Sequence, residues 1–339
     1  MTTLTPRRVK ELLARICTRR VLVIGDVMLD QFIWGRVSRI SPEAPVPVIE
    51  FDRENFMPGG AANVARSLVA LGAPTELFGV VGRDAAARQL AGLLSEHAVN
   101  CAGLLPVSSR MTTRKVRIIA QRQQVARVDR ESRGDLDVAA TRRLLAAIKP
   151  RLARTDAVVV GDYGKGVVTQ ALLNELTLRC RARGVWLSFD PKPVHHLDLR
   201  DLSLLTPNRK EAFELAELKE GAAARPANPL NDAELLRAAD TLFAKLKPAL
   251  LLITLGEQGM LLCQRGRPPF HVPTAAREVF DVSGAGDTVI ASFTLAIAAG
   301  ASPVEAAMFS NHAAGVVVGK IGTATVAPEE LLASFQRGA

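Results

Sequence analysis

The sequence contains few cysteines and few aromatic residues. Its 339 residues include four cysteines, two tryptophans, one tyrosine and twelve phenylalanines. Cys17, Cys101, Cys180 and Cys263 show no CxxC or CxxH spacing, so neither a zinc site nor a disulfide framework is predicted, and we expect reduced, mostly buried thiols. The net charge of +9 comes from scattered basic residues. With few rings to stack on bases and no nucleic-acid motif, it does not predict a nucleic-acid-binding protein.

Long hydrophobic runs are also missing. The longest nearly uncharged apolar stretch, residues 288–299, is shorter than the roughly 18 to 20 residues that cross a bilayer. A basic N-terminal segment is followed only by a strand-length apolar run at 21–24, too short for a signal peptide. We therefore expect no membrane span and a cytoplasmic protein. The content of 48% hydrophobic and 23% charged residues excludes a disordered or fibrous chain.

Short apolar runs alternate with helix-length segments along most of the chain. This alternation predicts an α/β fold, with a layered sheet and helices on its faces. The predicted strands are 21–24, 76–80, 157–160, 185–189, 202–205 and 250–254. Four of these runs end on polar or glycine turns. Since ligands of open α/β sheets lie at the carboxyl ends of the strands, we look for functional residues at these turns.

Two segments depart from the alternation. Residues 32–56 contain three prolines and no helical period, and residues 112–129 are β-rich with interleaved basic side chains. We expect both to form strands outside the main sheet, as a small β lid over the strand ends. Ordinary loops and an edge hairpin are the alternative. No repeat or domain linker is visible, so residues 1–339 are predicted to form a single domain.

The strongest chemical signal is the glycine-rich segment 281–287 with the sequence DVSGAGD, which runs directly into an apolar helix. A glycine turn that opens a helix binds anions, because its backbone N–H groups can converge on a phosphate where the helix dipole favours negative charge. Asp287, in the first turn, could take a proton from a hydroxyl near that phosphate. Alternatively, Asp287 only complements the helix dipole and the glycines only form a tight turn.

A second glycine pair lies near the N-terminus. Gly59 and Gly60 allow a polar ligand to approach the backbone, and Asn63 offers a donor and an acceptor to a hydroxyl-rich molecule. Asp26 and Asp30 follow the first strand, where carboxylates can accept pairs of sugar hydroxyls or serve as turn residues. The GxxxxGK[ST] and GxGxxG signatures are both absent, so phosphate binding needs another arrangement.

Four motifs in this order resemble the ribokinase-like, PfkB-type carbohydrate kinases. Besides the two glycine segments, residues 206–211 (TPNRKE) are similar to the N-x-x-E motif of that family, and residues 254–259 (TLGEQG) to its T-x-G-x-x-G nucleotide turn. The resemblance implies a ribokinase-like three-layer sandwich, with a mostly parallel central sheet between two helical layers and a small β lid. It also implies that the protein is an ATP-dependent enzyme that uses Mg²⁺.

A narrower resemblance is to the bacterial D-glycero-β-D-manno-heptose-7-phosphate kinases. It rests on residues 25–30, 39–48, 123–124, 162–166, 190–192 and 313–323. The H-x-G-H motif of the nucleotidyltransferase often fused to that kinase is absent, so the chain resembles the stand-alone form. The implied reaction makes the 1,7-bisphosphate for lipopolysaccharide core precursors. A PfkB-type kinase of another sugar, or a non-catalytic anion- or nucleic-acid-binding protein on the same fold, are the alternatives.

The resemblance also implies roles for individual residues. Asp287 is the base that deprotonates the anomeric hydroxyl, and the anion hole is formed by Gly284, Ala285 and Gly286. The ATP side comprises Asn208, Arg209, Lys210, Glu211, Thr254, Gly256, Gly259 and Asn311, with Glu211 holding Mg²⁺ through water. The substrate side comprises Asp30, Gly59, Gly60, Asn63, Asp162 and Asp190. Three cations are candidates for binding the 7-phosphate, although each could be a surface charge: Arg122, Lys165 and Lys192. A homodimer through the lid is expected.

Overall fold

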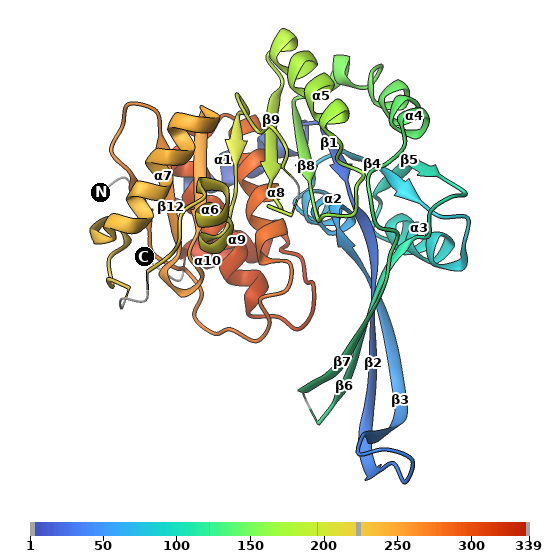
Figure 1. The fold of residues 1–339 in the computed structure, drawn as a ribbon. Helices are drawn as coiled ribbons and strands as arrows, with labels where there is room; N and C mark the ends of the chain where they lie inside the picture. The colour runs from blue at the N-terminus through green and yellow to red at the C-terminus, as the bar shows by residue number, and fades with distance from the viewer. Residues whose placement is uncertain (1–3, 122, 195, 222–224, 337–339) are drawn as a thin grey trace.

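A computed structural model describes residues 4–121, 123–194, 196–221 and 225–336. Its central sheet has nine strands in the order β13-β12-β11-β10-β9-β8-β1-β4-β5 (Figure 1). Its pairings are parallel except for β11 with β12 and β12 with β13, which are antiparallel. The strands are β1 (Val21–Gly25), β4 (Thr75–Val81), β5 (Asn100–Pro106), β8 (Ala157–Gly161), β9 (Trp186–Asp190), β10 (Leu204–Leu205), β11 (Leu250–Thr254), β12 (Met260–Gln264) and β13 (Phe270–Val272).

The central strands are apolar along their whole length because helices cover both faces of the sheet. Every residue of β1 and of β8 is buried, as expected for parallel strands with no solvent-facing side. All six strands expected from the sequence are present, which confirms the α/β prediction. The expected strand at 202–205 is reduced to the two residues of β10.

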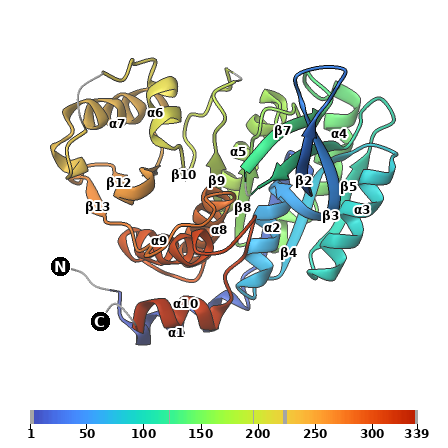
Figure 2. The same cartoon turned by 90° about the horizontal axis from the view of Figure 1, so that it is seen from below.

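Helices lie on both faces of the sheet (Figure 2), and an apolar core lies between the sheet and each helical layer. One core is covered by α1 (Pro6–Ile16), α2 (Ala61–Ala70), α3 (Ala85–Glu96), α8 (Ala285–Ala298), α9 (Pro303–Val318) and α10 (Pro328–Gln336). The other is covered by α4 (Val138–Ile148), α5 (Gln170–Arg183), α6 (Arg209–Ala216) and α7 (Ala233–Leu246). Three short 3-10 helices are η1 (Leu152–Arg154), η2 (Pro229–Asn231) and η3 (Gly256–Gln258). This is the expected three-layer arrangement.

A second sheet of four strands, in the order β3-β2-β6-β7, projects from the body of the molecule (Figure 1). It consists of β2 (Val27–Ile40), β3 (Pro47–Gly60), β6 (Thr113–Ala120) and β7 (Gln123–Arg130). The two segments that depart from the alternation therefore lie in this sheet, which extends beyond the expected 32–56 to residues 27–60. Its base is buried at the start of β2 and the end of β3, and its far part is exposed.

The cysteines of the chain are free thiols in different environments. Cys180 and Cys263 are buried, but Cys17 is exposed, contrary to the expectation of mostly buried thiols. Burial raises the pKa of Cys180 to about 11 and that of Cys263 to about 12, so both remain protonated.

Within the ranges that the structure describes, we find no helix with both the length and the apolar character that crossing a bilayer requires.

Candidate active site

The candidate site lies at the edge of the main sheet where the parallel strands end. β1 ends at Gly25, β8 at Gly161, β9 at Asp190 and β11 at Thr254. The first turns of α2, α6 and α8 begin close to these strand ends, and the base of the small sheet adjoins them. The structure therefore brings sequence segments more than 200 residues apart to one place, as Asn63 and Asp287 show through their hydrogen bond.

Asp287 is the buried centre of this site. Its Oδ2 accepts a hydrogen bond of 2.6 Å from Asn63 Nδ2, and its Oδ1 accepts one of 2.5 Å from the Tyr163 hydroxyl. Burial raises the pKa of Asp287, whereas these two hydrogen bonds lower it. Each carboxylate oxygen retains a second lone pair that a substrate hydroxyl can use.

The glycine turn before Asp287 forms the start of α8. Gly284, with φ of 79°, is in the left-handed conformation, and a Cβ there would lie 2.7 Å from Asn63 Nδ2. The first intrahelical bond runs from the Thr288 amide to the Gly284 carbonyl, at 3.0 Å. The amides of Gly286 and Asp287 are therefore first-turn donors that the helix does not use itself, as an anion hole requires. Of the three residues predicted for the anion hole, Gly286 keeps its amide free of the helix, Gly284 is the N-cap, and the Ala285 amide donates within the turn, to Val282 O at 3.2 Å.

The residues predicted to bind the sugar gather at the base of the small sheet. Asp30 is buried on β2 opposite the end of β3, where a Cβ on Gly59 would lie only 2.1 Å from Asp30 Oδ2. Arg117 on β6 donates to Asp30 Oδ1 at 2.5 Å. Gly60 has φ of 59° and ends β3 directly before α2, on which Asn63 lies. The structure therefore places Asp30, Gly59, Gly60 and Asn63 on one side of Asp287.

Asp26 is not available for sugar hydroxyls. Its two carboxylate oxygens accept hydrogen bonds from the backbone amides of Tyr163, Lys165 and Val167, at 2.9 to 3.0 Å. Its side chain is almost completely buried. The sugar-binding interpretation of Asp26 is thus replaced by a structural one, in which this carboxylate holds the turn that follows β8.

Half of the residues predicted for the nucleotide side line a pocket of about 430 Å³ on the other side of the glycine turn. Six residues predicted from the sequence contribute to its wall: Thr254, Gly256, Gly259, Ala285, Gly286 and Asn311. Gly259 has φ of 84°, and a Cβ there would lie 2.1 Å from Val272 O. Asn311 Nδ2 donates to Pro273 O at 2.7 Å, which fixes its amide in the pocket wall. The pocket is mostly apolar, as a base-binding pocket should be.

The N-x-x-E motif begins α6 as a capping box beside this pocket. Asn208 Oδ1 accepts from the Glu211 amide at 3.0 Å, and Glu211 Oε2 accepts from the Asn208 amide at 2.9 Å. Glu211 Oε1 accepts from Lys192 Nζ at 2.9 Å. A bridge between Asn208 and Thr254 joins the motif to the end of β11.

Asp190 lies between the two sides of the site. Its Oδ1 accepts a hydrogen bond of 2.9 Å from the Thr206 hydroxyl. Burial, with the nearby charges of Glu211 and Asp287, raises its pKa well above the ordinary value. Three acidic groups thus lie close together, although the described residues contain no group of three metal ligands arranged around one point. A cation held partly through water would relieve this repulsion, so the residues fit Mg²⁺.

Several predicted residues lie elsewhere or are already engaged. The buried Arg209 guanidinium pairs with Glu220 at 2.6 Å and Asp232 at 2.8 Å, on the side of α6 that faces α7. Lys210 is exposed and faces Glu214 along α6, at 3.6 Å. Arg122 lies outside the described residues.

Of the remaining substrate-side candidates, Lys165 and Asp162 belong to the turn after β8. Lys165 Nζ pairs with Glu131 at 2.5 Å. The buried Asp162 accepts from the Gly164 amide at 2.9 Å, so it shapes this turn.

Sequence reasoning missed three side chains of the site. The Tyr163 hydroxyl donates to Asp287, Arg117 donates to Asp30, and Lys115 lies close enough to Asp287 for its charge to lower the Asp287 pKa. The available signal for Tyr163 is that the only tyrosine of the sequence lies two residues after a buried strand. Lys115 and Arg117 were visible only as alternate basic residues of a strand, which put them on the same face.

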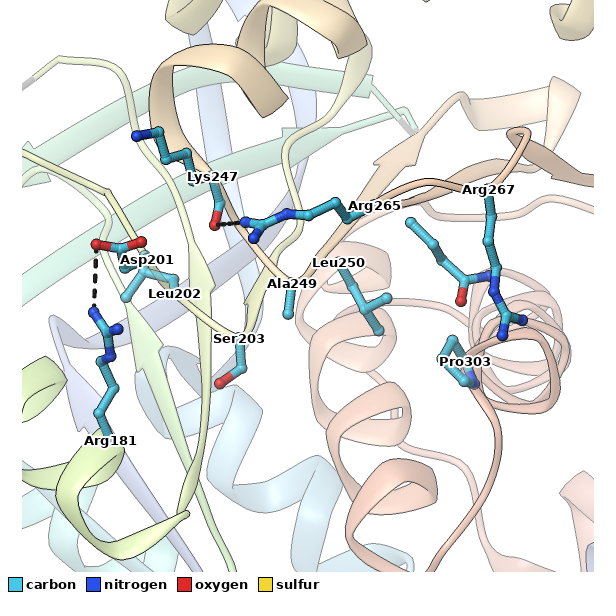
Figure 3. Close-up of a pocket in the computed structure, with 11 residues that line it drawn as sticks. Arg181, Asp201, Leu202, Ser203, Lys247, Ala249, Leu250, Arg265, Arg267 and Pro303 are labelled. Atoms are coloured by element: carbon cyan, nitrogen blue, oxygen red, sulfur yellow. Dashed lines mark hydrogen bonds and ion pairs between the residues drawn. The ribbon is translucent and has the colours of Figure 1, made fainter.

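A second pocket, of about 530 Å³, lies at the opposite edge of the sheet, near the amino ends of β10 and β11 (Figure 3). Basic side chains surround it, but they engage separate partners. Arg181 pairs with Asp201 at 3.3 Å, and Arg265 donates to Lys247 O at 2.8 Å. These cations do not converge on one point, so the site around Asp287 is the better candidate.

Comparison with known proteins assigns the family. The family model described as pfkB family carbohydrate kinase matches residues 18–330. The chain belongs to this family. The prediction of a PfkB-type carbohydrate kinase is thereby confirmed, and the motif order that led to it spans the matched region.

Relatives and solved structures agree with this assignment. The protein named Bifunctional protein HldE of Caulobacter vibrioides is 48% identical over 315 residues, covering 93% of this chain and 63% of the relative. The one of Desulfatibacillum aliphaticivorans is 44% identical over 319 residues, covering 94% of this chain and 63% of the relative. The chain thus spans less than two thirds of the length of these relatives. The Arabidopsis thaliana ribokinase structure, with ribose and ATP, has a TM-score of 0.73 at 19% identity and covers 94% of this chain and 99% of that one, which confirms the ribokinase-like fold.

Proposed function

We propose that the protein transfers the γ-phosphoryl group of ATP to the anomeric hydroxyl of D-glycero-D-manno-heptose 7-phosphate. The product would be the 1,7-bisphosphate, a precursor for the lipopolysaccharide core. The observation that carries the proposal is the position of Asp287, between the sugar-side residues and the nucleotide-side pocket, with its carboxylate in contact with Asn63 and its helix opening at the anion turn. The narrower sequence motifs of heptose-7-phosphate kinases support the choice of sugar.

The proposed step is a direct transfer between the two sides of the site. The O–H bond of the sugar hydroxyl breaks as Asp287 takes the proton, and a bond forms between the sugar oxygen and the γ-phosphorus. The bond from that phosphorus to the bridging oxygen breaks, and ADP leaves with the electron pair. The amides of Gly286 and Asp287 stabilise the transferring group through the charge they offer at the start of α8. The residues of the site mainly position the reactants and exclude water.

Mg²⁺ fits beside the capping box of α6. Glu211 and Asp190 would hold it, in part through water, and the ion would neutralise charge on the ATP phosphates. Lys192, which already pairs with Glu211 at 2.9 Å, lies on this side of the site and would contribute to the same neutralisation.

The phosphate already on the sugar needs cations on the other side of Asp287. Lys115, Arg117 and Lys165 supply them there. Burial lowers the pKa of Lys115, and the charges of Lys165 and Arg117 lower it further, while Asp30 raises it. A phosphate dianion would remove the repulsion between Lys115 and these two cations, of which Arg117 also pairs with Asp30 and Lys165 with Glu131. We propose these three residues as the binding site for the 7-phosphate.

Replacing Lys115 tests this assignment. In Lys115→Met, we expect kcat/KM for the sugar phosphate to fall about 10- to 100-fold, since a hydrogen bond to a charged group is lost. The unphosphorylated heptose should be affected much less. Lys247→Met, which removes an exposed lysine at the opposite edge of the sheet, is the control. Equal losses for both sugars would contradict the assignment.

We propose that the chain forms a single kinase domain and that the small sheet is its lid. We also propose that two copies of the chain dimerise by pairing through this lid. β7 is exposed along all eight residues and ends one edge of the sheet. Large apolar side chains are exposed on the projecting part, among them Phe51, which is 66% exposed, and Val128, which is 50% exposed. A projecting edge of this kind invites pairing.

Light scattering at micromolar concentration should therefore give a dimer. The double variant F51E/V128E should be monomeric, because charges replace apolar contacts at the edge and face of the sheet. The single variant V138E, which alters an exposed valine on α4, should remain dimeric. A monomeric wild-type protein would overturn the proposal.

The choice of acceptor is tested by a coupled ADP-release assay with Mg·ATP. Heptose 7-phosphate is compared with fructose 6-phosphate, ribose and adenosine. We expect a strong preference for the heptose phosphate. Turnover of another acceptor alone would retain the kinase and discard this substrate, whereas no turnover with any acceptor would favour a binding protein on this fold.

A further inference from the structure

The turn after β8 contains a tyrosine to which the proposed function gives no role. Residues 162–166 read DYGKG, and the only tyrosine of the chain lies there. The Tyr163 hydroxyl lies 2.5 Å from Asp287 Oδ1. Because the Tyr163 pKa is raised well above its ordinary value, first by burial and then by the charge of Asp287, this hydroxyl keeps its proton and acts as a donor.

The Tyr163 ring lies in a slot between two glycines. A Cβ on Gly161 would lie 2.9 Å from Tyr163 Cε2, and one on Gly60 would lie 3.3 Å from Tyr163 Cδ2. A side chain at position 161 would thus displace the ring. The close approach holds the hydroxyl at a fixed distance from the end of β8.

The backbone of the turn is held by one buried carboxylate. Asp26 accepts from the amides of Tyr163 and Lys165 with Oδ2, both at 2.9 Å, and from the Val167 amide with Oδ1 at 3.0 Å. Asp26 follows β1 directly, and β1 pairs with β8 in the middle of the main sheet. The position of Tyr163 is therefore set from the rigid centre of the fold.

On these contacts, we propose that Tyr163 is the positioning residue of Asp287, and that Asp26 acts on Asp287 through Tyr163. With Tyr163 on Oδ1 and Asn63 on Oδ2, the carboxylate cannot rotate, and each oxygen keeps one lone pair for the substrate. Arg66 in turn donates to Asn63 Oδ1 at 3.0 Å, so both partners of the base are themselves held. The inference rests on the proposed role of Asp287 as the base.

Several charged groups face Asp287 and set its proton affinity together with Tyr163. Asp30 from β2 raises the Asp287 pKa and Lys115 from β6 lowers it. Asp190 from β9 and Arg66 from α2 also interact with its charge. The Tyr163 hydrogen bond stabilises the charged carboxylate, so its removal raises the Asp287 pKa. At a given pH more of the base is then protonated and inactive, and the acid limb of activity moves to higher pH.

The test is Tyr163→Phe, which keeps the ring in its slot and removes only the hydroxyl. We expect kcat to fall about 10- to 100-fold, the KM for ATP to stay within about twofold, and the acid limb of the kcat profile to move upward. Thr206→Val is the control, since it removes a hydroxyl from the neighbouring carboxylate of Asp190 and should not move the limb upward. An unchanged kcat, or a loss with an unmoved acid limb, would overturn the role of Tyr163.

A double-mutant cycle tests the part assigned to Asp26. If Asp26 acts through Tyr163, Asp26→Asn lowers kcat in the wild type but adds little to Tyr163→Phe. If the fold-losses in kcat of the two single variants multiply in the double variant, Asp26 does not act through Tyr163. Asp287→Asn, made alongside, separates the two proposals: if it retains turnover, the base assignment fails, whereas an inactive Asp287→Asn with an unshifted Tyr163→Phe profile rejects only the positioning role.

Discussion

Asp287→Asn is expected to lower kcat by about 10²- to 10⁴-fold, the usual contribution of a general base. The change is isosteric, and the amide cannot take the proton of the sugar hydroxyl. The pocket proposed for ATP lies on the other side of the glycine turn, so the dissociation constant of ATP should change little. Initial rates in the ADP-release assay and calorimetric titration with ATP measure the two effects separately.

The control for this experiment is Asp240→Asn, the same chemical change at an exposed position of α7. Its rate should match the wild type. If Asp287→Asn retained nearly full turnover, the base would be another group, and the mechanism would lose its central residue. If it lost ATP binding as well, Asp287 would act in shaping the anion turn.

Gly59→Ala should strongly weaken sugar binding. The new methyl group would lie 2.1 Å from Asp30 Oδ2, so the Asp30 carboxylate must leave its place at the base of the small sheet. If Asp30 binds the sugar as proposed, the loss of its hydrogen bonds should raise the KM for the sugar about 10- to 100-fold. The KM for ATP should change little, because the nucleotide-side pocket is lined by other segments.

A matched control is Gly92→Ala on α3. A Cβ at Gly92 meets nothing within 4 Å, so this variant should bind sugar normally, and alanine should favour the helix. Steady-state kinetics with varied sugar and varied ATP distinguish the cases. A normal sugar KM in Gly59→Ala would show that Asp30 has no part in sugar binding.

Much of the fold could be predicted from the sequence because short segments of the chain indicate its strands and helix starts. Buried parallel strands such as 157–161 read as uninterrupted apolar runs, and the glycine turn before Asp287 marks the start of a helix. The polar turns at the carboxyl ends of the strands predict where the candidate residues gather, although no single turn predicts how they contact one another. The order of the four motifs indicates the carbohydrate kinase family, which no single segment indicates.

The rest depended on contacts between distant segments, which a sequence pattern does not contain. Asp26 and Asp30 both follow the first strand, and the sequence does not distinguish their roles. In the structure, Asp26 accepts hydrogen bonds from three backbone amides, whereas Asp30 faces Gly59. Arg209 belongs to the N-x-x-E motif, but its side chain forms ion pairs with Glu220 and Asp232. The role of a charged side chain depends on its partner, and the partner can be identified only in the folded structure.

The central claim is that Asp287 directs a phosphoryl group to the anomeric hydroxyl of a sugar that already carries a phosphate. Phosphorus NMR of the reaction with Mg·ATP and heptose 7-phosphate tests it most directly. The account predicts a new anomeric phosphate signal beside the retained 7-phosphate signal, growing in step with ADP, and its absence with Asp287→Asn. Formation of inorganic phosphate alone, or a new phosphate on a different hydroxyl, would contradict it.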